Sequence, residues 1–178
     1  RVAHQSPMRL LPMRTAAAER AGAAACALGS YGGGVLGGDV LRLRVRATDG
    51  ASLAITTQSS TKVYRAKRDG RATRQALDAS VADGALLVVA PDPLVPFADS
   101  VYEQAQSFAI APGGSVVVVD WIGAGRVSSG ERWAFASYRS RSEYHAVAAD
   151  DATMLDDDAA PSADPPALRE ALWLAGRG

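Results

Sequence analysis

The chain has 178 residues and a mass of 18.5 kDa, which fits one domain or a large part of one. Its 19 basic and 19 acidic side chains balance, so it lacks the basic excess expected of a protein that binds nucleic acid or anionic membranes. Apolar residues make up 48% of the sequence, which argues against bulk disorder. A single cysteine, Cys26, rules out an internal disulfide framework, and no run approaches the roughly 20 apolar residues of a membrane helix.

The balanced total hides two halves of opposite charge. Residues 1–75 carry 13 basic and 4 acidic side chains, a net of +9, and residues 76–178 carry 6 basic and 15 acidic ones, a net of −9. We expect these charges either to pair with one another or face solvent, or to form surfaces that meet charged partners.

The first third of the chain predicts short strands after an ambiguous start. Residues 15–27 are rich in alanine, which favours a helix, but they have almost no large apolar residue to anchor it, so helix and strand both stay open. Six glycines between 29 and 38 indicate a turn-rich loop. Residues 40–47 alternate apolar residues with arginines, as a half-buried strand does, and Asp49-Gly50 predicts a hairpin turn into a strand at 52–58.

The middle of the chain continues this pattern. Another short strand begins at Val63, and Asp83-Gly84 predicts a turn before residues 85–90, a strand buried on both faces that prolines end. Residues 107–111 and 115–121 flank Pro112-Gly113-Gly114, which indicates a second hairpin.

The remaining elements complete the predicted fold class. Residues 132–138 alternate as a strand, whereas helices are expected at 70–80 and 99–105, and no internal repeat is detected. Short strands separated by turns, without alternating long helices, predict an all-β fold of mainly antiparallel strands with one to three short helices.

The C-terminal region differs in composition. Five aspartates between 150 and 158 and three prolines between 161 and 166 indicate a solvated loop or linker. Residues 167–175 predict a short helix. The expected organisation is a β-rich domain, residues 1–149, and an acidic, proline-containing tail, residues 150–178.

Two motifs match catalytic or binding patterns weakly. Residues 32–37 fit the dinucleotide pattern G-x-G-x-x-G, which needs a helix after it, but a strand is expected there. Ser59-Ser60-Thr61-Lys62 fits S-x-x-K, in which the serine must open a helix, but its surroundings are strand-like. No Walker A loop is present, so nucleotide hydrolysis is not expected. A serine acyl-transfer enzyme that uses Ser59 and Lys62 stays as an alternative.

Metal ligands of the tight-binding kind are sparse. His4, His145 and Cys26 are not spaced as pairs, so no tight site of nitrogen and sulfur ligands is expected. Carboxylate side chains remain candidates for weak metal binding. The alternative is that they form salt bridges or cap turns. The residues by themselves therefore favour a binding or scaffolding protein over an enzyme, including a generic β-rich adaptor without metal handling.

Four polar segments follow one another along the chain. They are residues 32–39, which end in Gly-Gly-Asp; residues 56–65, Thr-Thr-Gln-Ser-Ser-Thr-Lys-Val-Tyr-Arg; residues 91–97, followed by Tyr102 and Gln104; and residues 120–141. Over roughly residues 7–156 this set resembles the UreD (also called UreH) family of urease accessory proteins. Members of that family are longer, with strands before residue 1 and after residue 156, so the chain is expected to be an incomplete or divergent member.

The resemblance implies an elongated scaffold of stacked sheets and a role in urease maturation. Family members bind the accessory protein UreF, which recruits the GTPase UreG, and the assembly docks on apo-urease and helps nickel reach the active site. They are proposed to pass nickel through an internal polar tunnel. The resemblance thus implies a non-enzyme with transient nickel, no tightly bound cofactor and a cytoplasmic location. The balanced charge separately predicts no nucleic-acid or membrane partner.

A scaffold that hands on nickel should hold it weakly, and oxygen ligands bind it less tightly than histidine or cysteine cages. The candidates for the metal path share oxygen-bearing side chains: Asp39, Thr57, Gln58, Thr61, Gln104, Asp120 and Glu131. Turn capping is the alternative for the threonines and aspartates, and Asp39 suits both roles. The other motif residues are expected to support the fold or contact partners: Gly37, Gly38, Lys62, Tyr64, Arg126, Arg132, Ser140 and Arg141.

Overall fold

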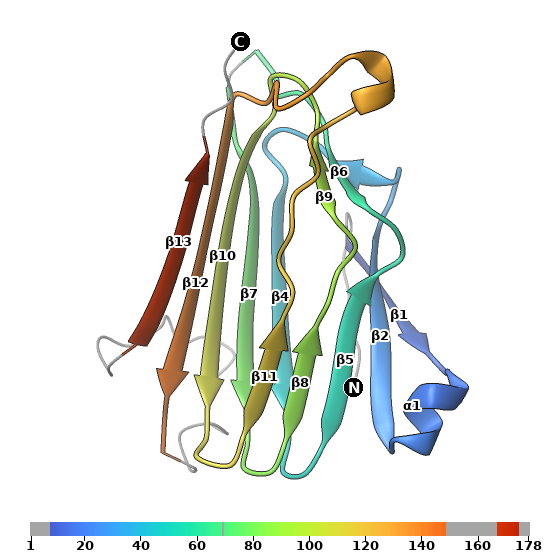
Figure 1. Cartoon of the computed structure of the whole chain (residues 1–178), viewed down its shortest axis with the longest axis vertical. Coiled ribbons are helices and arrows are strands. Elements are labelled where there is room, and N and C mark those ends of the chain that lie inside the picture. The colour runs from blue at the N-terminus through green and yellow to red at the C-terminus, as the bar shows by residue number, and fades with distance from the viewer. Residues whose placement is uncertain (1–7, 69, 149–166, 175–178) are drawn as a thin grey trace.

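Two large β-sheets face each other and a small third sheet joins them (Figure 1). The computed structural model describes residues 8–68, 70–148 and 167–174, the last range by its backbone only. Sheet A contains, in spatial order, β1 (Met8–Met13), β2 (Ala23–Ser30), β5 (Ser52–Thr57), β8 (Leu86–Val89) and β11 (Ser115–Val118). Sheet C contains β13 (Ala167–Leu174), β12 (Ser137–Ala146), β10 (Val101–Ile110), β7 (Thr73–Val81) and β4 (Val40–Ala47). Sheet B contains β3 (Gly34–Val35), β6 (Thr61–Val63) and β9 (Leu94–Pro96).

The chain visits the three sheets in turn and so winds into coils. β2, β3 and β4 form the first coil, β5, β6 and β7 the second, and β8, β9 and β10 the third. The fourth coil runs from β11 through a bridge between Ile122 and Leu94 to β12. Each strand pairs in parallel with its counterpart in the next coil, which makes this region a four-coil β-solenoid.

The expected all-β fold of stacked sheets is confirmed, but the expectation of mainly antiparallel strands was wrong. Among the described strands, only β1 with β2 and β12 with β13 pair antiparallel. The turns at Asp49-Gly50 and at residues 112–114 exist, yet each joins a strand of sheet C to a strand of sheet A. Turn residues make the chain reverse direction, but they do not decide whether the next strand pairs with the previous one or with the coil below.

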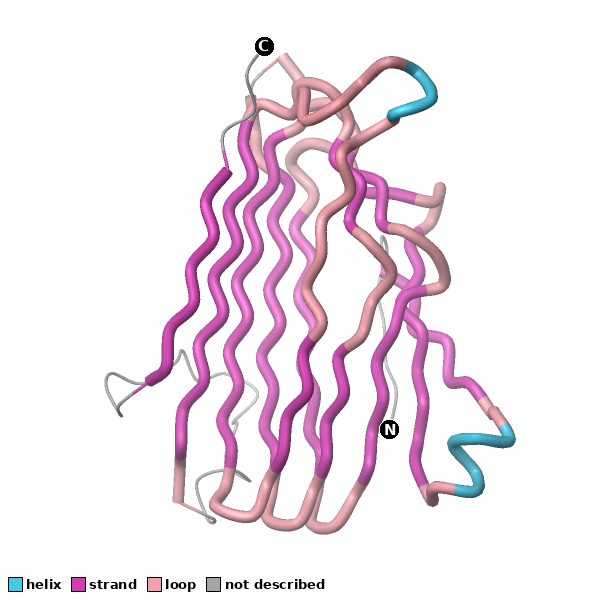
Figure 2. The backbone as a smooth tube through the Cα atoms, viewed as in Figure 1, coloured by secondary structure: helices cyan, strands magenta, loops and turns pink. Residues whose placement is uncertain are grey.

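These sheet-joining turns stack in register at one end of the molecule, where Figure 2 shows them side by side. Residues 48–51, 82–85 and 111–114 each close with a bond from the fourth residue's N–H to the first residue's carbonyl oxygen, at 2.9, 3.2 and 2.9 Å. Adjacent turns are linked because Gly50 N–H donates to Asp83 O at 3.1 Å and Gly84 N–H donates to Gly113 O at 3.2 Å. The stacked turns are a structural repeat that the sequence analysis did not detect.

Three segments that predict helices are strands instead. Residues 70–80 contain most of β7, residues 99–105 begin β10, and residues 167–174 of the third segment form β13. In each case a neighbouring strand supplies backbone partners, and this tertiary pairing outweighs local helix propensity. The ambiguous residues 15–27 contain both structures: α1 (Ala16–Arg20), whose first turn is capped by Thr15, and most of β2.

The last predicted strand, residues 132–138, is mostly loop. It follows the short 3₁₀-helix η1 (Val127–Ser129), and β12 begins only at Ser137. Of the predicted tail, residues 150–166 lie outside the described residues, while β13 pairs with β12 in sheet C.

The solenoid interior contains two hydrophobic cores, one toward the stacked turns and one toward the opposite end. The first core joins side chains from sheets A and C, among them Leu43, Leu77, Leu87 and Phe108. The second core contains the buried residues Val35, Leu41, Val63, Leu94, Tyr102, Phe135 and Tyr138. Between the two cores, inward positions of sheet C become polar along the coils: Leu41 pairs with Gln75, Gln75 with Gln104, and Gln104 with Ser140.

Candidate functional site

Two adjoining cavities occupy this polar part of the interior. They enclose about 90 and 60 Å³. Their shared wall consists of Leu28, Leu43, Thr57, Thr61 and Gln75. The first cavity extends toward β3 and the loop that joins β5 to β6, and the second extends toward the fourth coil. Together they span all four coils of the solenoid.

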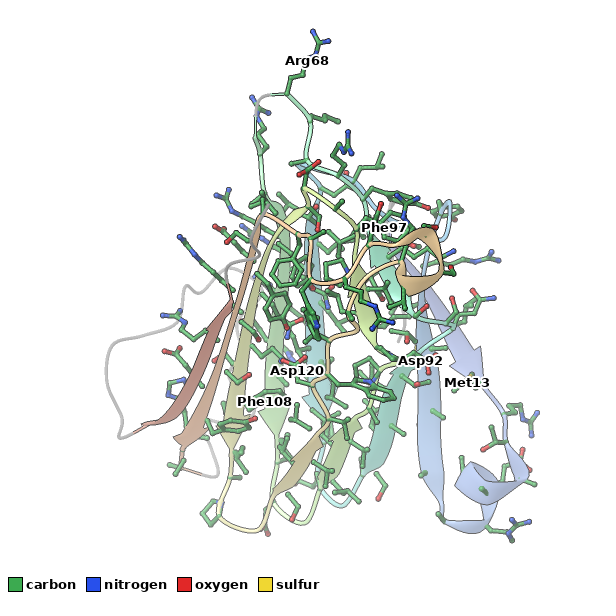
Figure 3. All side chains as sticks on the ribbon, turned by 45° about the horizontal axis from the view of Figure 1, so that its top comes forward. Met13, Arg68, Asp92, Phe97, Phe108 and Asp120 are labelled. Atoms are coloured by element: carbon green, nitrogen blue, oxygen red, sulfur yellow. The ribbon has the colours of Figure 1, made fainter. Side chains whose placement is uncertain are left out.

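Asp120 is the centre of a hydrogen-bond network in the second cavity. Its Oδ2 atom accepts bonds from Gln104 Nε2 at 2.8 Å, Ser140 Oγ at 3.1 Å and Gln106 Nε2 at 3.3 Å. Gln106 also donates to Ser142 Oγ at 3.3 Å. The donors come from β10 and β12 of sheet C, whereas Asp120 follows β11 of sheet A (Figure 3). The network therefore bridges the two facing sheets.

Two aromatic hydroxyls face the same network. Tyr102 is fully buried, and its hydroxyl lies 3.0 Å from Gln75 Oε1 and 3.1 Å from Gln104 Oε1. The rings of Tyr102 and Tyr138 stack with centroids 5.8 Å apart. Burial raises the pKa of Tyr138 to about 12 and raises the pKa of Tyr102 well above its ordinary value, so both remain neutral at physiological pH.

Partial burial also raises the pKa of Asp120 above its ordinary value, and the bonds from Ser140 and Gln104 oppose that rise. A carboxylate that is incompletely compensated by its neighbours is a favourable place for a cation, because a cation replaces the solvation that burial removed.

The structure gathers five of the seven predicted path residues around the cavities. Thr57 and Thr61 line both cavities, Gln58 lines the first, and Gln104 and Asp120 line the second. Asp39 and Glu131 line neither cavity.

Asp39 caps a turn. Its Oδ2 atom accepts a bond from Leu36 N–H at 2.8 Å, and its own N–H donates to Leu36 O at 2.9 Å. Gly37 and Gly38 lie within this turn. A Cβ on Gly37 would stand 2.9 Å from Lys67 N, and Gly38 has a φ of 92°. The Gly-Gly-Asp motif thus lets the loop before β4 pack closely against the segment after β6.

Glu131 belongs to a cluster at the opposite end from the stacked turns. It binds Arg126 through both carboxylate oxygens, with Arg126 Nε 3.0 Å from Oε2, and it accepts a bond from Ala98 N–H at 3.1 Å. The Arg126 guanidinium lies 4.4 Å from the centre of the Phe97 ring, which Figure 3 shows beside the loop that carries η1. Arg126, and then the Ala98 N–H, hold the pKa of Glu131 below its ordinary value.

Replacing Glu131 by glutamine is expected to lower the melting temperature at neutral pH and to flatten its pH dependence. A carboxylate with a lowered folded pKa adds stability that is fully present above its ordinary value of 4.5 and is lost as the pH falls through the folded value. The difference between wild type and Glu131→Gln should therefore shrink on acidification to about pH 3. Thermal unfolding at both pH values measures it.

The matched control for this prediction is Glu19→Gln. Glu19 also pairs with an arginine, Arg14, but its side chain is 58% exposed, and such pairs contribute little. An unchanged melting temperature of Glu131→Gln at neutral pH would contradict the role assigned to the cluster.

The other motif residues lie in separate places. Ser140 is buried in the Asp120 network, whereas Lys62 on β6 and Arg132 after η1 are exposed. Arg141 lies on the outer face of sheet C, 3.6 Å from Glu143. Tyr64 packs edge-on against Phe97, with ring centroids 5.2 Å apart, and so joins the Glu131 cluster.

Sequence reasoning missed four members of the site: Gln75, Gln106, Ser142 and Tyr138. The sequence feature that could have identified them is the alternation of inward-facing and outward-facing residues along two strands. Inward positions read Tyr102, Gln104, Gln106, Phe108 on β10 and Tyr138, Ser140, Ser142, Tyr144 on β12. The helix expected at 99–105 concealed the first of these series, because a helix would place the glutamines on different faces.

The weak motifs do not have the surroundings that their chemistry needs. Residues 32–37 lead into strand β4, Ser59 lies in the bend after β5, and Lys62 is on β6, so neither motif opens a helix. Within residues 8–68 and 70–148, no three His, Cys, Asp or Glu side chains come together to hold a metal ion. His4 is outside the described residues, and His145 lies on β12, 4.0 Å from a Glu143 oxygen. None of the described helices is long and apolar enough to cross a membrane.

Comparison with known proteins identifies the family. The chain matches the family described as UreD urease accessory protein over residues 1–177. Urease accessory protein D of Oryza sativa subsp. indica is 41% identical over 134 residues, which cover 75% of this chain and 44% of the relative. Urease accessory protein UreD of Sorangium cellulosum is 45% identical over 137 residues, 77% of this chain and 42% of the relative.

A third relative, urease accessory protein D of Arabidopsis thaliana, is 43% identical over 111 residues, 62% of this chain and 37% of the relative. The chain thus spans less than half the length of these curated relatives. The resemblance seen in the four polar segments is confirmed, and the chain belongs to the UreD family of urease accessory proteins.

Proposed function

We propose that the chain acts in urease maturation as a non-enzymatic scaffold. It binds a UreF-type accessory protein, reaches a UreG-type GTPase through that partner, docks on apo-urease and assists nickel delivery to the urease active site. A cytoplasmic location is part of this proposal. The observation that carries it is the oxygen-lined interior around Asp120 in a chain of the UreD family.

The chemistry of this interior suits a metal that must be released. Inward donors are carboxylate, carboxamide and hydroxyl groups, which bind nickel less tightly than imidazole or thiolate ligands do. The path residues of this proposal are Thr57, Gln58, Thr61, Gln104 and Asp120, with Asp39 and Glu131 as the outlying members. A site that binds nickel weakly can release the ion to the next site, whereas a set of tight ligands would retain it.

Exposed side chains supply candidate partner contacts. Trp133 is 48% exposed and has a φ of 53°, and the loop that holds it is fixed by a bond from Trp133 N–H to Ala124 O at 2.7 Å. An exposed tryptophan on a fixed backbone is typical of a binding hot spot, because little conformational freedom is lost on docking. We include this loop in the partner-binding surface.

Co-purification tests the scaffold role. A tagged version of the chain is expected to retain a UreF-type protein, and to retain a UreG-type GTPase only when the UreF-type protein is present. Trp133→Ala should weaken the first interaction at least about ten-fold, and Val117→Ala, which removes an apolar side chain of similar exposure on β11, is the matched control. Failure of the folded wild-type chain to retain the UreF-type protein would overturn the proposal.

A further inference from the structure

The buried hydroxyl of Tyr102 faces two carbonyl oxygens. Gln75 Oε1 lies 3.0 Å from it and Gln104 Oε1 lies 3.1 Å from it. A phenol has one hydrogen, so it donates to only one of these acceptors at a time. The other carbonyl oxygen then faces the hydroxyl oxygen without a proton between them, which is unfavourable in a fully buried position.

Each glutamine relieves this conflict if its carboxamide turns over. With Gln75 turned, its N–H₂ donates to Tyr102, Tyr102 donates to Gln104 Oε1, and Gln104 Nε2 keeps its 2.8 Å bond to Asp120. With Gln104 turned, the bonds run the other way, from Gln104 to Tyr102 to Gln75, and Gln104 Oε1 points toward Asp120. The oxygen and nitrogen of a carboxamide are similar in size, so neither turn needs extra space.

The direction of this chain of bonds depends on what lies beside Asp120. Without a cation, the carboxylate needs the Gln104 N–H₂ group, because a carbonyl oxygen in its place would put two acceptors 2.8 Å apart. A divalent cation on Asp120 reverses the preference, since it attracts a carbonyl oxygen and repels an N–H₂ group.

We propose that Gln104 is a two-position gate whose carboxamide turns its oxygen toward a divalent cation at Asp120, and that Tyr102 passes the reversal to Gln75. Gln75 lies on the wall shared by the two cavities, so arrival of an ion in one cavity changes the group presented to the other. This inference rests on the proposed nickel path. It assigns Gln75 and Tyr102 as positioning residues that act on the ion without touching it.

Asp120 is the charge that determines the orientation of the Gln104 carboxamide. The charged and titratable side chains that line the second cavity are Asp92, Tyr102 and Asp120, and Tyr138 stacks on Tyr102 behind it. Asp92 is exposed, and its backbone N–H donates to Thr57 Oγ1 at 2.8 Å. The tyrosines stay neutral because burial raises both pKa values.

Nickel titration of the full chain tests whether Gln75, which does not contact the ion, affects Ni²⁺ affinity. Gln75→Leu removes the acceptor that the buried Tyr102 hydroxyl needs in the cation-bound arrangement. In the empty arrangement it removes only the bond that the Tyr102 oxygen accepts from Gln75, and Tyr102 still donates to Gln104 Oε1. It should weaken Ni²⁺ binding about five- to ten-fold, the equivalent of one hydrogen bond. Leu28→Ile changes another residue of the same shared wall but adds no atom that can bind a metal, so its Ni²⁺ affinity should match that of wild type.

A second measurement reads the carboxamide directly. In ¹⁵N-labelled protein, the Gln104 side-chain N–H₂ should show nuclear Overhauser contacts to Ser140 without metal and to the Tyr102 ring with diamagnetic Zn²⁺. Gln104→Met identifies the signal by its loss.

The outcomes distinguish failure of the gate from failure of the proposed scaffold function. Unchanged contacts on adding Zn²⁺, equal Ni²⁺ affinity of Gln75→Leu and wild type, or no measurable Ni²⁺ binding by wild type would each overturn the gate. The proposed function falls separately if the chain does not bind its UreF-type partner.

Discussion

Under the proposed function, Asp120→Asn is expected to abolish most of the nickel-dependent activation of urease. Asparagine keeps the size of the side chain and an acceptor oxygen for Gln104, Gln106 and Ser140, but it removes the negative charge from the second cavity. Loss of a carboxylate ligand should lower Ni²⁺ affinity at least about ten-fold. Urease activity in cells and direct Ni²⁺ titration of the purified variant measure the two effects.

The fold should tolerate this change. Because burial raises the pKa of Asp120, the folded state binds its proton more tightly than the unfolded state does, and the ionised group lowers stability as the pH rises past its ordinary value. The neutral variant is therefore expected to melt no lower than wild type at neutral pH, which separates lost nickel handling from lost folding.

Asp49→Asn is the matched control, since it removes the same charge from an exposed turn far from both cavities. Its activation and Ni²⁺ affinity should equal those of wild type. Full urease activation by Asp120→Asn at normal expression would contradict the metal path and favour an adaptor without metal handling.

Phe108→Ala is expected to destabilise the protein by about 3–5 kcal/mol, the range for truncating a fully buried phenylalanine. Phe108 is fully buried in the first core, and its ring stacks on Tyr144 with centroids 5.1 Å apart. It comes from β10, which lies between β7 and β12 in sheet C, so the cavity would loosen contacts between three coils. Urea unfolding followed by circular dichroism measures the change.

Val117→Ala provides the comparison for Phe108. Val117 is 48% exposed on β11, and truncating it should change the free energy of unfolding by less than about 0.5 kcal/mol. A loss below about 1 kcal/mol for Phe108→Ala would mean that the two large sheets do not depend on this core.

Much of the strand content was predictable because it follows from alternation. Residues 40–47 form β4 with Leu41, Leu43 and Val45 inward and the arginines outward, as expected. The turns at 49–50, 83–84 and 112–114 were also located correctly. The strand partners were not predictable, because the same turn residues serve a hairpin and a solenoid, and only contacts between residues about 30 positions apart distinguish them.

The candidate site was predicted in part. Thr57, Thr61, Gln104 and Asp120 come from separate motifs, and their gathering around two cavities depends on the stacking of coils. Gln75 and Gln106 belong to none of the four polar segments. Gln75 also lies in residues 70–80, where the sequence predicted a helix. Asp39 illustrates a choice that the sequence left open, and the structure shows it capping a turn outside both cavities.

The sequence by itself determined that this is a β-rich, charge-balanced chain with the four polar segments of the UreD family, because alternation, turn residues and motifs are local properties. Only the tertiary structure decided that the strands run parallel, that the turns stack, and that the glutamines of two neighbouring strands meet Asp120 from the opposite sheet. The physical reason is that these features depend on backbone pairing and burial between coils, and such long-range contacts outweigh the local propensities that a single sequence displays.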